Sequence, residues 1–173
     1  GSVHSALSSI STTLRDYARA CLKIGASGIF LVPLTWASRD TCNETFYREY
    51  GRPYDLQVLA SVRNGEFNIL HVCKEHIMID LLLDYPVHAF NWADYSSGNP
   101  SLAEVKEWTN KAVMGGVDHD RLTDMSDKEA AEHIGAALAI GSERLLISGG
   151  CAISPLTPDA NRAAVVSRVR DFS

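Results

Sequence analysis

The chain has 173 residues and a mass of 18.9 kDa. That is enough for one domain with a hydrophobic core, but short of the about 250 residues of a typical (β/α)₈ barrel. A composition of 46% apolar and 21% charged residues excludes a disordered chain. No apolar run is long enough for a membrane span, and a net charge of −5 disfavours nucleic acid as a partner.

Four cysteines are too few for a disulfide scaffold in a chain of this length. The first residues show no basic region followed by an apolar run, so no secretory signal is visible. We therefore expect a cytoplasmic protein with reduced thiols. The cysteines are Cys21, Cys42, Cys73 and Cys151.

Helical and extended patterns alternate along the chain. Two capping boxes, Ser101 with Glu104 and Ser126 with Glu129, mark helix starts, and Pro158 marks another. In chain order the patterns predict helix 3–22, strand 26–34, helices 41–50 and 53–63, strand 66–73, helix 75–83, strand 87–94, helix 101–113, strand 112–118, helix 126–141, strand 145–153 and a last helix from residue 157.

This alternation predicts an α/β fold, a parallel sheet covered by helices, in one domain over residues 1–173. Two architectures fit: an open doubly wound sheet, or part of a barrel. No Gly-x-Gly-x-x-Gly follows the first strand and no Walker loop is present, which weakens a nucleotide-binding interpretation of the open sheet.

In either architecture the carboxyl ends of the strands gather the functional side chains. His71 and Cys73 lie two apart on a strand and so share a face, and Cys151 ends the last strand. One imidazole and two thiols leave a fourth position open, the pattern of a catalytic zinc site. The alternative is that these cysteines are small core residues.

Two carboxylates end neighbouring strands. Asp94 follows the third strand and Asp118 follows the fourth, after Gly115 and Gly116. Both acids are candidates to line a pocket. The glycine pair fits either a close approach of ligand or tight packing.

Several motifs together resemble the uroporphyrinogen decarboxylase superfamily. Besides His71-Val72-Cys73, the motifs that carry the resemblance are residues 25–30, 85–94, 114–118 and 148–158. The family is a single TIM (β/α)₈ barrel. The resemblance implies that the five strands here correspond to strands 4–8, the C-terminal five βα units, with no counterpart of strands 1–3.

The superfamily has two branches. Decarboxylases end their last strand with a Gly-His-Gly type sequence, where this chain has Gly149-Gly150-Cys151. The zinc-dependent corrinoid methyltransferases carry His-x-Cys and a distant Cys, which His71, Cys73 and Cys151 match. Lys74 departs from the glycine that is usual after the first cysteine.

The resemblance implies Zn²⁺ held by His71, Cys73 and Cys151, activating a small thiol to accept a methyl group from a corrinoid on a partner protein. Asp94 and Asp118 would orient the substrate as catalytic residues. One alternative is a decarboxylase acting on a porphyrinogen. Another is a non-catalytic fragment or subunit that lacks strands 1–3 and associates through its open sheet edges.

Overall fold

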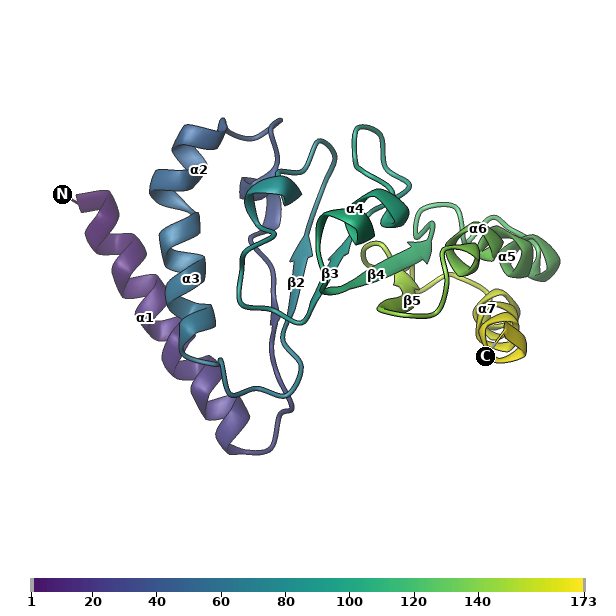
Figure 1. Cartoon of the computed structure of the whole chain (residues 1–173), viewed down its shortest axis with the longest axis horizontal. Helices are drawn as coiled ribbons and strands as arrows, with labels where there is room; N and C mark the ends of the chain where they lie inside the picture. Colours follow the sequence, from purple (N-terminus) through teal and green to yellow (C-terminus); the bar gives the residue numbers. More distant parts are fainter. Residues whose placement is uncertain (1, 173) are drawn as a thin grey trace. The chain divides into compact units, whose positions relative to one another are not determined.

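A computed structural model describes residues 2–172. Its elements alternate as the sequence predicts, and five strands follow one another in the order β1-β2-β3-β4-β5. Among these residues, no helix has the length and apolar character needed to cross a membrane. The helices, including the short 3₁₀ helices η1 and η2, and the strands (Figure 1) are α1 (Ser2–Lys23), β1 (Phe30–Leu31), η1 (Leu34–Ala37), α2 (Glu44–Tyr50), α3 (Arg52–Ala60), β2 (Ile69–Val72), η2 (Ile79–Leu81), β3 (Ala89–Trp92), α4 (Leu102–Trp108), β4 (Ala112–Val117), α5 (Asp127–His133), α6 (Gly135–Ala139), β5 (Leu145–Gly149) and α7 (Asp159–Phe172).

The chain divides into two compact units, one ending at Phe90 and the other beginning at Asn91, within β3. In the first unit, β1 pairs in parallel with β2, with Phe30 opposite Ile69. Helix α1 packs along α3 (Figure 1). A small apolar core forms where Ala18 meets Val58 and Val62.

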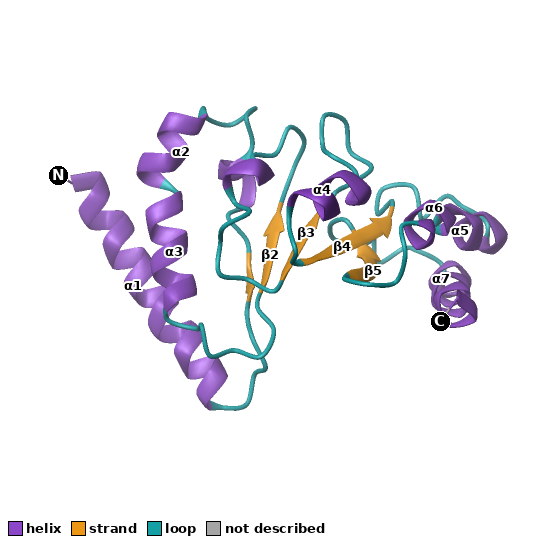
Figure 2. Ribbon diagram, viewed as in Figure 1, coloured by secondary structure: helices purple, strands orange, loops and turns teal. Residues whose placement is uncertain are grey.

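In the second unit, β4 and β5 pair in parallel over five residues, from Val113 opposite Leu145 to Val117 opposite Gly149. Helices α5 and α7 lie side by side (Figure 2). The core of this unit joins the end of β4 to these helices. Its buried residues are Val117, Leu122, Ala130, Ile134, Leu138 and Val165.

The two capping boxes are confirmed. The Ser101 hydroxyl accepts from the Glu104 N–H while the Glu104 carboxylate accepts from the Ser101 N–H, and Ser126 and Glu129 do the same. The predicted ends of the helices that these capping boxes start differ from the observed ends. The predicted helix 101–113 ends at Trp108, because Thr109 is extended. The predicted helix 126–141 is interrupted at Ile134, which separates α5 from α6.

The predicted helix over residues 75–83 is wrong, and only the short 3₁₀ helix η2 forms there. Ile77 makes an antiparallel bridge with Ser38, and the Met78 N–H donates to the Ala37 carbonyl at 2.8 Å. These long-range backbone bonds, together with a φ of +46° at His76, are incompatible with an α-helix at the start of the segment. The predicted strand 26–34 is also shorter, since only Phe30 and Leu31 pair with β2.

Candidate functional site

The end of β2 presents His71 and Cys73. His71 lies within β2 and Cys73 directly after its last residue, and their ligand atoms lie within 4.8 Å of each other. The His71 side chain is buried, and its ring stacks on Phe30 of β1 with centroids 5.6 Å apart and planes 21° apart. Cys73 is half-buried. Packing against Phe30 therefore restrains the imidazole from within the first unit.

The chain turns sharply after Cys73. Lys74 has φ of +82°, a backbone conformation that favours glycine. A glycine would adopt this backbone conformation without strain. Lys74 carries a Cβ, so its backbone is strained here.

We expect Lys74→Gly to raise the free energy of unfolding by about 1 kcal/mol, because relief of left-handed strain outweighs the added chain entropy. Urea unfolding of the two proteins measures the change. Lys74→Ala is the control, since it removes the side chain but keeps a Cβ at positive φ. An equal gain in both variants would place the cause in the side chain instead.

Cys151 lies just beyond β5, in the second unit, and is half-buried. The glycines before it allow a close chain approach. A Cβ on Gly150 would lie 2.6 Å from the Ala93 Cα and 2.8 Å from the Trp92 carbonyl oxygen. The Gly150 N–H donates to the Val117 carbonyl at 3.2 Å. A larger residue at position 150 would displace the segment that carries Cys151.

His71 and Cys73 in the first unit, and Cys151 in the second, each offer one atom that can bind a metal ion. All four cysteines are free of disulfides. One imidazole and two thiols are a donor set that suits zinc, with three protein ligands and an open position. The described residues offer two other candidate groups, which are acidic and more exposed, as is common without any metal. They are Asp40, Glu75 and His76, and Asp118, His119 and Asp120.

Asp94 is held against β4. Its Oδ1 accepts a hydrogen bond from the Gly116 N–H at 3.0 Å, and a Cβ on Gly115 would lie 2.6 Å from the same oxygen. A Cβ on Gly116 would lie 2.5 Å from that of Ala137. Burial raises the pKa of Asp94, an effect that its backbone hydrogen bonds oppose. The glycine pair therefore serves tight packing around this carboxyl group.

Asp118 closes the turn after β4. Its Oδ1 accepts from the N–H groups of Asp120 and Arg121, both at 3.2 Å. Its own N–H donates to Nε2 of His133 at 3.0 Å, so that nitrogen carries no proton. Burial lowers the pKa of His133, which favours the same neutral form. His133 lies 15 residues from Asp118, and no spacing or motif predicts their contact.

Asn91 is a second residue that sequence reasoning missed. Its buried amide donates to the carbonyl oxygens of Met114 at 2.8 Å and Gly149 at 3.1 Å, and to the Ser148 hydroxyl at 3.3 Å. One side chain of β3 thereby joins β4 to β5. It fixes the end of the strand that leads to Cys151.

The motifs and the fold point to one family. The family model of uroporphyrinogen decarboxylase (URO-D) matches residues 1–172. The chain belongs to the uroporphyrinogen decarboxylase family. No curated protein matches the sequence.

Among solved structures, a methyltransferase from Methanosarcina mazei resembles this URO-D family chain, with a TM-score of 0.75 and 20% sequence identity. The match covers 94% of this chain and 47% of that one. The chain thus spans less than half the length of that methyltransferase. The likeness confirms the expected α/β fold, five parallel strands alternating with helices, as in part of a TIM barrel.

Proposed function

We propose that this URO-D family chain is the metal-holding part of a zinc-dependent methyltransferase, which activates a thiol to accept a methyl group from a corrinoid. The donor chemistry of His71, Cys73 and Cys151 carries the proposal, because imidazole and thiolates are ligands that zinc prefers. The fold of a protein described as a methyltransferase supports it. Because the chain spans less than half of that protein, the activity of a whole enzyme is itself part of the proposal.

Each residue has a role in this proposal. His71, Cys73 and Cys151 would hold zinc, which lowers the pKa of a bound thiol so that it reacts as the thiolate. The thiol proton would be released to solvent first, and the thiolate sulfur would then take the methyl group. The electron pair of the cobalt–carbon bond would remain with the corrinoid, which a partner protein would present. Asp94 and Asp118 would orient the substrate.

The second candidate function is decarboxylation of a porphyrinogen, and the name of the family model supports it. Cys151 stands against it, because it occupies the place where the decarboxylase pattern has histidine. The two functions differ in their need for metal, so zinc content separates them.

A third possibility is that the chain acts only with a partner. Strands β1 and β5 end the order of strands. β1 pairs through two residues only, and Phe30 on it is half exposed. Unpaired strand edges invite association, so we propose self-association or pairing with a chain that supplies further strands. Sedimentation velocity over a range of concentrations tests this, and a monomer throughout would contradict self-association.

Zinc analysis tests the main proposal. We expect purified protein, dialysed against zinc and then against buffer, to retain about one zinc per chain. Cys73→Ser and Cys151→Ser should each retain less than about 0.2, because loss of one thiolate from three protein ligands removes most of the affinity. Elemental mass spectrometry measures the content.

Cys21→Ser and Cys42→Ser are the matched controls, since both thiols lie outside the group. They should retain zinc as the parent does. Parent protein without zinc, or equal loss in all four variants, would contradict the proposal. Circular dichroism of each variant separates loss of ligand from loss of fold.

A further inference from the structure

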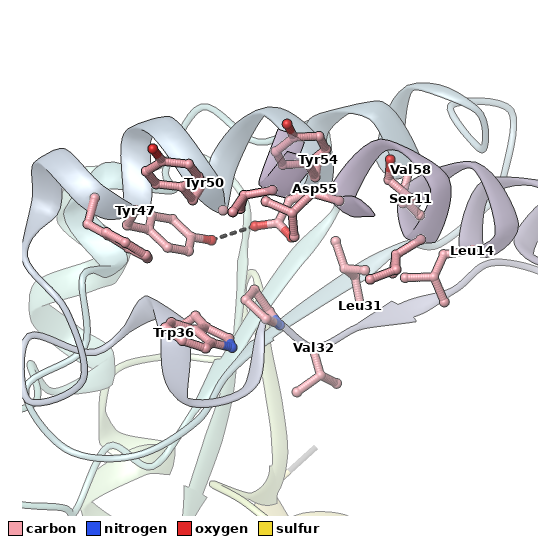
Figure 3. Close-up of a pocket in the computed structure, with 16 residues that line it drawn as sticks. Ser11, Leu14, Leu31, Val32, Trp36, Tyr47, Tyr50, Tyr54, Asp55 and Val58 are labelled. Atoms are coloured by element: carbon pink, nitrogen blue, oxygen red, sulfur yellow. Dashed lines mark hydrogen bonds between the residues drawn. The ribbon is translucent and has the colours of Figure 1, made fainter. Parts of the chain in front are cut away.

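A cavity of about 370 Å³ lies within the first unit, between α1, the segment after β1, and helices α2 and α3 (Figure 3). Its volume falls within the range of small-molecule sites, about 300–1,000 Å³. Its walls are mainly aliphatic and aromatic. They include Leu7, Leu14, Trp36, Phe46, Tyr50 and Tyr54.

One carboxyl group, that of Asp55, faces this apolar cavity (Figure 3). Its Oδ2 accepts hydrogen bonds from the hydroxyls of Tyr47 at 2.5 Å and Tyr85 at 3.0 Å. Among the described residues, the hydrogen bonds to this carboxylate end on Oδ2, so Oδ1 has capacity to accept a hydrogen bond from a molecule in the cavity that Asp55 lines.

The positive charge that acts on Asp55 is that of Arg52, but Arg52 pairs with a different carboxylate. The Arg52 guanidinium donates to both carboxylate oxygens of Asp84, at 3.0 and 2.5 Å, and lies 5.1 Å from the centre of the Tyr85 ring. Burial raises the pKa of Asp55 to about 6, with hydrogen bonds from Tyr47 and Tyr85 and the charge of Arg52 opposing the rise. The carboxyl group is thus ionised at neutral pH.

The aromatic wall is continuous. Phe46 is packed between two other rings, with its centroid 6.1 Å from that of Trp36 and 4.7 Å from that of Tyr50. Trp36 is half exposed. Ring faces attract cations, most strongly when little water separates them. An ionised carboxylate among aromatic walls favours a positively charged ligand with an apolar body.

We propose that this cavity binds a small organic ammonium ion, with an N–H of the ligand donating to Oδ1 of Asp55 and its hydrocarbon body packing against Trp36, Tyr50 and Tyr54. An anion would be repelled by the negative charge of the Asp55 carboxylate. A neutral molecule would bury the same apolar surface but lack the attraction between an ammonium ion and the Asp55 carboxylate. That attraction is the reason to expect a cation in this cavity. The site is independent of the proposed zinc ligands.

Benzylammonium, benzyl alcohol and benzoate are matched probes, since they share one ring and differ in charge. Isothermal titration calorimetry of the full chain at neutral pH measures their affinities. We expect benzylammonium to bind at least about tenfold more tightly than either of the other two, as loss of a charged hydrogen bond predicts. Asp55→Asn should remove this preference, and Asp16→Asn, at an exposed carboxylate, should keep it.

Equal binding of benzylammonium and benzyl alcohol by the parent protein would overturn the proposal, whatever the variants do. No binding of benzylammonium at millimolar concentration would overturn it as well. If Asp55→Asn does not fold, Trp36→Leu replaces it as the variant, because Trp36 is half exposed and removal of its ring should weaken benzylammonium more than benzyl alcohol.

Discussion

Asn91→Leu is expected to lower the free energy of unfolding by about 2 kcal/mol. Leucine has nearly the shape of asparagine, so the change removes the amide and little else. The carbonyl oxygens of Met114 and Gly149 then lose their hydrogen bonds from the buried Asn91 amide, although the Gly149 oxygen keeps the one from the Ser148 hydroxyl at 3.0 Å. Each buried acceptor left without a donor costs about 1–3 kcal/mol.

Urea unfolding followed by circular dichroism measures this loss, with the slope of the transition checked for constancy. Asn110→Leu is the control, because Asn110 is exposed, and it should change stability by less than about 0.5 kcal/mol. A loss below about 1 kcal/mol for Asn91→Leu would mean that water replaces the amide, and that the side chain does not hold β4 and β5 together.

Local sequence signals predicted the parts of the fold that local physics decides. The capping box at Ser101 and Glu104 needs only four residues, and it formed. The apolar run that starts at Leu145 likewise predicts β5, and the strand begins at that residue. By contrast, residues 75–83 look helical in isolation, but Ile77 pairs with Ser38, which lies 39 residues earlier. Such a bond carries no local signature.

The candidate site divides in the same way. His71 and Cys73 were predictable because two positions on one strand share a face, and a chain of alternating elements brings strand ends to one edge. The supports of the site depend on distant partners. Neither the contact between His133 and Asp118 nor the hydrogen bonds of Asn91 follow from spacing. Asp55 lies in the first turn of α3, where acids are common, and its contact with Tyr85, 30 residues later, follows from no local pattern.

Between about pH 4 and pH 6, the stability of the protein should fall as pH rises because of Asp55. Burial raises the pKa of this carboxyl group to about 6 in the folded chain, against about 3.9 in the unfolded chain. In this window the folded state holds a proton that the unfolded state has released, so raising the pH favours unfolding. A difference of two units corresponds to about 3 kcal/mol, fully lost above pH 6.

Asp55→Asn isolates this contribution, because asparagine keeps the shape and an acceptor for Tyr47 and Tyr85 but does not titrate. The groups that face Asp55 are these two tyrosines and Arg52, and the variant retains all three. Urea unfolding at several pH values should show the parent losing stability relative to the variant from pH 4 to 6. Asp16→Asn should follow the parent throughout. A constant difference between parent and Asp55→Asn would show that Asp55 ionises in the folded chain as it does in the unfolded one.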